Sequence, residues 1–567
     1  MRRTLPLLTL ALLSCNSDKD EVIDDSGAAA WAPDAWCPGA AGCESAEGAL
    51  SAGAALTSLV PECFEAFEDL DEDAEWDSNE VFLDCGCDRL CEGDEGYPGP
   101  DAGEGDGEFQ VVWLAGFQNN RPAQGVHDPI QARALVLDKG DTRVAIVVVD
   151  LVGLFYDQVQ AIREGVDAAG LEVDHVLVMS SHAHEGPDSV GLWGPTESVA
   201  GNPPEYMAFI RQQAVEAVRL AVADLREVGE YKVGSVDAAS YSEYGILSVL
   251  QDKRDPKIVD TTFTAGIFRD TAGETIATFA HFGNHPEAMA DENGLITADY
   301  IYSLREGLES GVVWDSYTRE GYGGVSLFFT GTVGGMMTPL GITVRDPDGN
   351  EQREYTFPRV IAMGKLKAEW AMDAIEAATP VQDPDLSFAR VVFRLPVENW
   401  GFQALFLSNI LDRETFDWDP AQAVSDENMP TVETEIDHIA LGPLEMLTVP
   451  GELLPELAIG GYDGSKVGTS YQEIIDEDNP NPPDLSQAPE GPYLKDYMTR
   501  EHRLILGLAN DELGYIVPPY NFVLDDFNPW FDEAEGDHYE ETNSLGPSLA
   551  PRIDEESSRL MEWVNAR

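Results

Sequence analysis

The chain has 567 residues, of which 104 are acidic and 34 are basic, so its net charge at pH 7 is −70. A charge of this size and sign repels nucleic acids and anionic lipid headgroups, which argues against both as general binding partners. The length suffices for about two to four domains, and the apolar content of 43% suffices for a large core. The acidic surface is consistent with solubility in salt and with weak binding of Ca²⁺ or Mg²⁺.

The first fifteen residues predict an export signal. Arg2 and Arg3 precede a short apolar stretch, a pattern typical of secretory signals and too short to span a bilayer. Its end, Leu12-Leu-Ser-Cys15, resembles the lipobox of bacterial lipoproteins. That resemblance implies cleavage before Cys15, lipid attachment to Cys15, and a protein anchored in the cell envelope, at the outer membrane, or extracellular. An ordinary signal peptide with another cleavage site is the alternative.

Six further cysteines lie close together, and none follows them: Cys37, Cys43, Cys63, Cys85, Cys87 and Cys91. In an exported chain an even number of cysteines predicts up to three disulfides, whose pairing the sequence leaves open. A metal knuckle at 85–91 is the less favoured alternative. We therefore predict an acidic tether at 16–35, a small disulfide-bonded module at 36–92 and a glycine-rich linker at 93–107. Within the module, residues 58–70 have apolar spacing near the helical period.

From residue 108 to residue 567 the composition is that of one large globular domain. Apolar runs rich in β-branched residues predict strands within 111–117, 132–137, 143–150, 175–182, 275–285, 325–335 and 444–452. Helical periodicity predicts helices at 156–169, 204–228 and 358–378. This order predicts an α/β (mixed α+β) fold, in which mixed sheets are flanked by helices.

Polar residues follow several of the predicted strands. His182 and His184 end one strand, and because they are two residues apart their rings point to the same side of an extended chain. His285 and Glu452 end two others. Ligands commonly bind at the carboxyl ends of strands, and neutral imidazole is the commonest metal ligand. Hydrogen-bonded loop residues are the alternative, but the recurrence favours a metal site. His281, inside a strand, is interpreted as a core histidine.

These blocks resemble the neutral, non-lysosomal ceramidase family, in the same order, over residues 109–560. The most specific are Ser181-His-Ala-His-Glu-Gly-Pro187, similar to the family's Thr-His-Thr-His-Ser-Gly-Pro, and Val449-Pro-Gly-Glu452. Further similar blocks are Leu114-Ala-Gly116-Phe117, Asn284-His285-Pro286, Leu508-Ala-Asn-Asp-Glu-Leu-Gly-Tyr515 and His538-Tyr539-Glu540. The family resemblance implies a mixed α+β catalytic domain.

The resemblance also implies one catalytic Zn²⁺, with four ligands: His182, His285, Glu452 and Tyr515. Tyr520 is a rival for the last position. Three N/O ligands with an exchangeable position suit catalytic zinc, and zinc-activated water would hydrolyse an N-acyl linkage in a lipid or lipid-like substrate such as ceramide.

Four other residues match family positions that meet the substrate. His184 and Tyr539 could donate a hydrogen bond to the developing oxyanion, as catalytic residues. Gly116 would let the backbone approach the substrate closely. Arg254 is a loose match to the family's substrate-binding arginine.

The chain also departs from the family pattern. Glu185 replaces a small polar residue, and the family's C-terminal β-sandwich is expected to be missing. Glu287 and Asp299 are candidates for carboxylates that orient a ligating imidazole, with a helix-cap role as the alternative for Asp299. Two other functions remain open: a zinc hydrolase of a different amide or ester, and a catalytically inactive surface-binding lipoprotein. The oligomeric state does not follow from the sequence.

Overall fold

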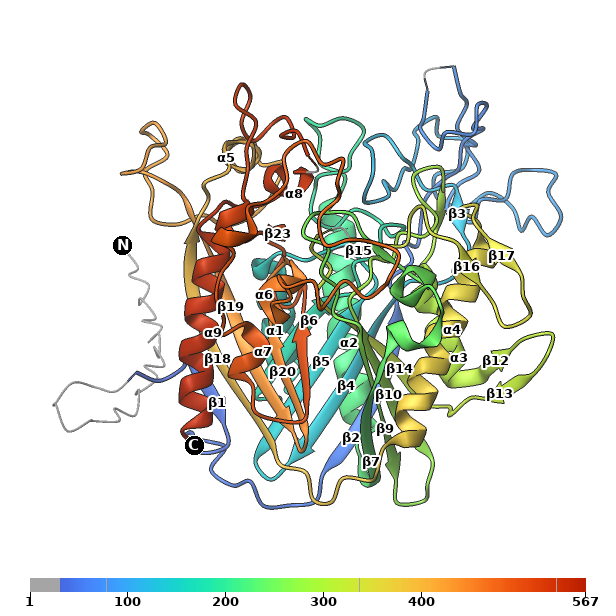
Figure 1. The fold of residues 1–567 in the computed structure, drawn as a ribbon. Helices are drawn as coiled ribbons and strands as arrows, with labels where there is room; N and C mark the ends of the chain where they lie inside the picture. The colour runs from blue at the N-terminus through green and yellow to red at the C-terminus, as the bar shows by residue number, and fades with distance from the viewer. Residues whose placement is uncertain (1–30, 78, 336, 537) are drawn as a thin grey trace, which may run out of the picture.

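The computed structural model describes residues 31–567 apart from 78, 336 and 537, so the predicted lipidation site Cys15 lies outside the described residues. Two large β-sheets lie face to face, and helices cover their outer sides (Figure 1). The α/β (mixed α+β) fold predicted from the sequence is therefore confirmed. No helix in the described part of the chain has the length and apolar character needed to cross a membrane.

The larger sheet has eight strands. In spatial order they are β14 (Val325–Thr330), β10 (Thr275–Phe282), β9 (Thr262–Asp270), β7 (Arg226–Asp237), β2 (Ser51–Ser58), β4 (Gln131–Lys139), β5 (Thr142–Val149) and β6 (His175–Ser180). The β5–β6 and β10–β14 pairs are parallel, whereas the other pairs are antiparallel. The parallel pairs bring the carboxyl ends of their strands to the same edge of the sheet.

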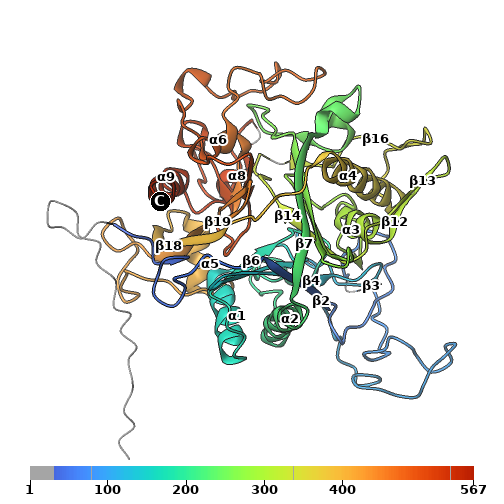
Figure 2. The same ribbon diagram turned by 90° about the horizontal axis from the view of Figure 1, so that it is seen from below.

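Four helices cover one face of this sheet: α1 (Tyr156–Ala168), α2 (Pro204–Ala223), α3 (Tyr300–Ser310) and α4 (Phe357–Ala377) (Figure 2). Alternate residues of β4 and β5, such as Ala134 and Val147, pack with Ile162 of α1 and Ile210 of α2. The other half of the sheet packs on α3 and α4 in the same way. Alternate residues of these strands face the helices and the second sheet, and both sets are apolar because the strands are buried on both faces.

The second sheet has five strands, in the order β1 (Ala35–Cys37), β18 (Leu386–Pro396), β19 (Thr431–Leu441), β20 (Leu444–Thr448) and β22 (His502–Leu506). Its inner face, which includes Phe388 and Met446, packs on Leu135 and Leu177 of the eight-stranded sheet. Helix α9 (Leu549–Asn565) covers its outer face, where Ile553 packs with Ile436. The core is therefore layered helix, sheet, sheet, helix.

Short elements connect these layers. They are β3 (Gly125–Val126), β8 (Gln251–Asp252), β11 (Leu295–Ile296), β12 (Gly311–Val313), β13 (Thr318–Glu320), β15 (Met337–Thr338), β16 (Val344–Arg345), β17 (Glu351–Gln352), β21 (Glu452–Leu453), β23 (Tyr515–Ile516), α5 (Trp400–Leu407), α6 (Pro455–Ile459), α7 (Leu494–Tyr497) and α8 (Tyr539–Thr542).

Three local predictions were wrong. The helix predicted to run to residue 228 ends at Ala223, because Arg226 starts strand β7, which pairs with β9 and β2. Pairing within the sheet outweighs the local helical periodicity there. Residues 111–117 form only isolated bridges at Trp113 and Leu114, and residues 58–70 are not helical.

The N-terminal region contributes one strand to each of the two large sheets. Strand β1 pairs with β18, and β2 pairs with β4 along its whole length. The boundary predicted at residue 92 therefore does not separate an independent module, since residues 35–58 belong to the sheets. Gly53 shows why this strand is so rich in small residues: a Cβ there would lie 2.2 Å from the Ala221 carbonyl oxygen of α2.

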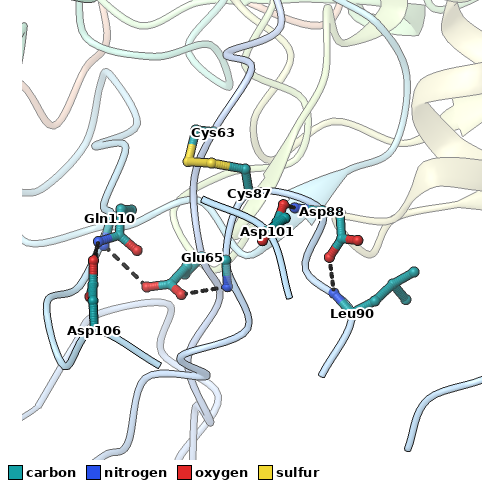
Figure 3. Close-up of a disulfide and its surroundings, with 9 residues drawn as sticks. Cys63, Glu65, Cys87, Asp88, Leu90, Asp101, Asp106 and Gln110 are labelled. Carbon is teal, nitrogen blue, oxygen red and sulfur yellow. Dashed lines mark hydrogen bonds between the residues drawn. A yellow bond between two sulfur atoms is a disulfide. The ribbon is translucent and has the colours of Figure 1, made fainter. Parts of the chain in front are cut away.

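The six cysteines in the described part of the chain all form disulfides, with the pairing Cys37–Cys43, Cys63–Cys87 and Cys85–Cys91. The last two close a loop-rich excursion after β2. Figure 3 shows how Glu65 supports the Cys63–Cys87 bridge, since its carboxylate accepts backbone hydrogen bonds from Gly86 at 2.8 Å and Gln110 at 3.2 Å. The disulfides thus stabilise a segment without a large core of its own.

Candidate metal centre and its cavity

The predicted ligands come from three pairs of parallel strands whose carboxyl ends meet. His182 follows β6, His285 follows β10, and Glu452 follows β20 at the start of β21. Glu452 pairs in register with Tyr515 of β23, which brings the fourth predicted ligand to the same edge. The structure therefore unites four residues that are widely separated in the sequence.

The ligand atoms lie at the spacing that a tetrahedral metal needs. Glu452 Oε2 is 3.4 Å from His182 Nε2 and 3.0 Å from His285 Nε2. His184 Nε2 is 3.2 Å from His182 Nε2, and the three histidines form one cluster of candidate donors within 4.8 Å. Ligands bound to zinc at 2.0–2.1 Å are separated by about 3.3 Å, so the residues present fit such an ion.

The backbone fixes the tautomer of His182. Its Nδ1 lies 2.7 Å from the Val152 carbonyl oxygen, which can only accept a hydrogen bond. Nδ1 therefore carries the hydrogen and Nε2 faces the cluster, the arrangement that orients ligating histidines in metalloproteins. His182 also has a φ of +67°, an uncommon conformation for a residue with a side chain. The local backbone conformation and the hydrogen bond to Val152 thus both hold the His182 ring in this orientation.

The electrostatics are those of a site prepared for a cation. Burial opposes a charge on His182, but the Glu452 carboxylate outweighs it and raises the pKa of the imidazole to about 9. Burial likewise opposes ionisation of Glu452, but His182 and His285 hold its pKa well below its ordinary value. Without a metal a proton occupies the centre of the cluster, and a bound metal would displace it.

His184 is held against the cluster by Gly116 and Arg121. A Cβ on Gly116, whose φ is +81°, would lie 2.4 Å from His184 Nδ1, so no other residue fits beneath the ring. The sequence resemblance implies that the backbone at Gly116 approaches the substrate closely. In the structure the group that the Gly116 backbone approaches is the His184 ring. The buried Arg121 guanidinium donates to the His184 carbonyl oxygen at 2.6 Å and lies 3.5 Å from Glu185. Glu185 thus has a local role beside Arg121, and its carboxyl group also accepts a hydrogen bond from the Asn293 amide at 2.8 Å.

The two predicted tyrosines lie together in the cavity. The rings of Tyr515 and Tyr539 are 5.9 Å apart in an edge-to-face arrangement. Burial, and then the Glu452 charge, raise the pKa of Tyr515 well above its ordinary value, and the same causes raise that of Tyr539. Both phenols are therefore protonated at neutral pH when no metal is bound. Tyr520, the rival for Tyr515, lines a different cavity.

Arg254 is not among the residues that line this cavity. Its buried guanidinium donates to Glu540 at 2.7 Å and to Glu541 at 2.7 Å, and also to the Asn521 carbonyl oxygen. It therefore anchors the segment that carries Tyr539. Asp299 caps α3 by accepting the backbone N–H of Tyr300, in agreement with the cap alternative.

The cavity beside the cluster has a volume of about 90 Å³. Its polar end includes His182, His184, Glu452, Tyr515 and Tyr539. The remaining wall is mostly apolar: Val152, Phe155, Val190, Leu192, Trp193, Phe402, Phe406, Leu411, Leu513 and Leu545. A reactive polar end joined to an apolar wall suits a substrate with a polar linkage and an alkyl chain.

Two carboxylates near the cluster were missed by the sequence reasoning or left undecided. Glu512 lines the cavity; burial, and then Glu452, raise its pKa to about 8, and its Oε2 has no hydrogen-bond partner among the described residues. A glutamate three residues before Tyr515 gives no signal of its own in the sequence. Glu287 is buried, and its Oε1 also has no hydrogen-bond partner within the described part of the chain.

A second, acidic group of candidate ligands lies on the disulfide-bonded excursion. Carboxylate oxygens of its first three members lie within 4.8 Å of one another, and Asp73 raises the pKa of Asp71. The carboxylates occupy positions one, three, five, nine and twelve of the loop, as side-chain ligands do in an EF-hand: Asp69, Asp71, Asp73, Asp77 and Glu80. The weak binding of Ca²⁺ or Mg²⁺ expected from the composition stays a prediction, for which this acidic group is a candidate.

Comparison with solved structures finds the same fold in neutral ceramidase. The chain aligns with the crystal structure of neutral ceramidase from Pseudomonas aeruginosa with a TM-score of 0.57 and 15% identity, over 91% of this chain and 75% of that one. A structure described as ceramidase complexed with C2 aligns with a TM-score of 0.57 and 14% identity, over 92% and 76%. No family model and no curated protein sequence matches. The resemblance inferred from the sequence blocks is thus confirmed at the level of the fold.

Proposed function

We propose that this protein is a zinc-dependent amidase that hydrolyses an N-acyl, ceramide-like linkage. The observation that carries the proposal is the convergence of His182, His285 and Glu452 at metal-ligand spacing, at the polar end of a cavity whose remaining wall is mostly apolar. The fold of neutral ceramidase supports this choice of chemistry over other metal-dependent reactions. Ligands of mixed nitrogen and oxygen type favour zinc over calcium or magnesium.

His182, His285, Glu452 and Tyr515 would hold the ion, which when bound supplies Lewis acidity that activates water and polarises a carbonyl group. The chain's own groups then orient the substrate. The apolar wall packs against the acyl chain and excludes water. The protonated phenol of Tyr539 and the neutral imidazole of His184 donate hydrogen bonds to the acyl oxygen as negative charge develops there.

Metal analysis tests the first half of this proposal. Purified wild type should contain about one zinc per chain, and His182→Ala and Glu452→Ala should lose it while remaining folded. Glu427→Gln, an exposed glutamate, is the matched control and should retain the metal. A well-folded wild type without stoichiometric metal would favour the alternative of a catalytically inactive surface-binding lipoprotein.

Substrate assays test the second half. Hydrolysis of ceramide should be compared with hydrolysis of short N-acyl compounds and of the corresponding esters. Release of fatty acid from ceramide, lost on zinc removal and restored by zinc, is the expected result. Zinc-dependent cleavage of short amides or esters alone would instead favour a hydrolase with a different substrate.

We also propose that the protein is exported and lipid-anchored through Cys15, which places it in the cell envelope, at the outer membrane. The support is the lipobox-like end of the signal sequence and the disulfides, which form in oxidising compartments. Metabolic labelling with a fatty acid should mark the wild type and not Cys15→Ser. Labelling of both proteins equally would contradict the anchor.

A further inference from the structure

Helix α5 exposes apolar side chains and buries its polar one. Its sequence, from Trp400 to Leu407, contains no charged residue. The amide of Gln403 is buried and donates to the Val397 carbonyl oxygen at 2.7 Å, whereas Trp400 is 57% exposed and Leu407 is 56% exposed. A helix in water normally shows the opposite pattern, so this one is suited to a less polar surrounding.

A neighbouring turn extends the same surface. Phe527 is 96% exposed and Phe531 is 59% exposed, and Asp525 holds the turn by accepting the backbone N–H groups of Phe527 and Asn528. A Cβ on Gly401 of α5 would lie 3.8 Å from the Phe531 ring, so the turn and the helix are in contact. We name the exposed set Trp400, Leu407, Phe527 and Phe531 the apolar rim.

The apolar rim is continuous with the cavity beside the metal cluster. Phe402 and Phe406, on α5 between Trp400 and Leu407, line that cavity. Tyr539, which lines it from α8, lies at the same end of the molecule as α5 (Figure 1). One helix thus presents apolar groups both to the outside and to the substrate cavity.

The surrounding charge restricts the partner. The apolar turn is flanked by acidic residues at 525–526 and 532–533, and the chain as a whole carries a net charge of −70. An anionic surface would be repelled, whereas a bilayer with no net charge would not. Tryptophan is also the side chain that most favours the boundary between lipid headgroups and acyl chains.

We infer that the apolar rim inserts into the surface of a bilayer of uncharged or zwitterionic lipids and places the cavity mouth against it. An N-acyl lipid substrate could then pass from the bilayer to the metal cluster without entering water. This rests on the proposed function for its choice of substrate, but the docking itself is independent of catalysis. It is also independent of any lipid on Cys15.

Vesicle binding tests the inference, with the Cys15→Ser chain used throughout so that no acyl anchor contributes. Binding to phosphatidylcholine vesicles should fall at least about tenfold in Trp400→Ser/Leu407→Ser and in Phe527→Ser/Phe531→Ser. Val313→Ser, an equally exposed apolar residue on β12, is the matched control and should bind like its parent. Vesicles rich in phosphatidylglycerol should bind more weakly at low salt.

A second measurement identifies the residue at the lipid. Brominated phosphatidylcholine should quench a component of the tryptophan fluorescence that is absent in Trp400→Phe. The inference is overturned if the parent chain does not bind zwitterionic vesicles, or if Val313→Ser loses as much binding as the rim variants. It is also overturned if the rim variants change only the self-association seen by sedimentation equilibrium, which would make the rim a protein interface.

The same experiments separate the inference from the proposed function. If the chain binds vesicles through the rim but hydrolyses no N-acyl lipid, the docking surface stands and the proposed activity fails. If it hydrolyses dissolved short-chain substrates, and the rim variants neither lose vesicle binding nor lose activity on vesicle-borne ceramide, the activity stands and the docking surface fails.

Discussion

Within the described residues, two buried clusters contain histidine and carboxylate at metal-ligand distances, yet only one of them suits a metal. The cluster of His175, Glu435 and Asp437 is as buried and as compact as that of the three cavity histidines. In it, Arg163 donates to Glu435 at 2.9 Å, and Asn510 donates to Asp437 at 2.6 Å. In this cluster, side chains of the protein itself provide the positive charge and the hydrogen-bond donors that the two carboxylates need.

The cluster of His182, His285 and Glu452 has no lysine or arginine partner within the part of the chain that the structure describes. The ion pairs of the Glu452 Oε2 atom are those with the His182 and His285 imidazoles. Residue types therefore do not distinguish a metal site from an ion-pair network. What distinguishes them is whether the positive charge comes from a side chain or has to come from outside.

Breaking the ion-pair network should have the largest effect on stability. Glu435→Gln would leave the buried Arg163 guanidinium without its charged partner, and we expect the free energy of unfolding to fall by about 3–5 kcal/mol. Urea denaturation followed by circular dichroism measures this. Zinc content should not change. Loss of zinc in this variant, or a stability equal to that of Glu427→Gln, would contradict the distinction between the clusters.

Zinc should increase the free energy of unfolding only by binding to the cluster of His182, His285 and Glu452. A free zinc concentration of a hundred times the Kd should raise the unfolding free energy of metal-depleted wild type by about 3 kcal/mol. Glu452→Gln should show no such increase, because it removes one ligand, whereas Glu435→Gln should retain it. Thermal unfolding with and without zinc provides the measurement, and an equal response in all three chains would refute the assignment.

The core histidine His281 extends the comparison, because it has a hydrogen-bond partner but no ion-pair partner among the described residues. Its Nε2–H donates to the Ile505 carbonyl oxygen at 2.8 Å, and burial lowers its pKa to about 4. The unfolded chain therefore binds a proton between pH 6.5 and 4 that the folded chain does not bind. Stability from this residue is complete above pH 6.5 and is lost as the pH falls.

We expect His281→Gln to flatten the pH dependence of unfolding in that range, by an amount on the order of 2 kcal/mol. The variant keeps a hydrogen-bond donor for Ile505 but cannot be protonated. Urea denaturation of wild type and variant at several pH values between 7 and 4 gives the difference. Parallel curves for the two chains would show that His281 does not titrate as its surroundings require.

The acidic loop at 69–80 should give the smallest effect and the opposite metal preference. Its ligands are all oxygen, so we expect Ca²⁺ to bind with a Kd on the order of 10⁻⁴–10⁻³ M, as in extracellular modules. Asp71→Asn/Asp73→Asn should abolish this binding in a calorimetric titration, and the exposed control Glu95→Gln should not. Zinc at the cavity cluster should be unaffected, and calcium binding that persists in the double variant would place it elsewhere.

Much of the fold and of the candidate site could be predicted from the sequence, because three of the four predicted ligands, His182, His285 and Glu452, follow strongly apolar strands. What the sequence could not provide was the meeting of strand ends from two different sheets. Strand β2 was missed, because its small residues have weak strand propensity and are selected by the close packing of α2 on Gly53. Glu512 was missed for a related reason, since only the folded loop brings it to the cavity.

The position of β2 has a mechanical consequence. In the strand pairing of the large sheet, β2 is the link between the β4–β5–β6 half and the half that begins with β7, and it meets β7 through only two residue pairs. His182 belongs to the first half and His285 to the second, while Glu452 comes from the other sheet. An ion held by all three would act as a clamp across this seam, so metal loading should set whether the halves unfold separately or as one cooperative unit.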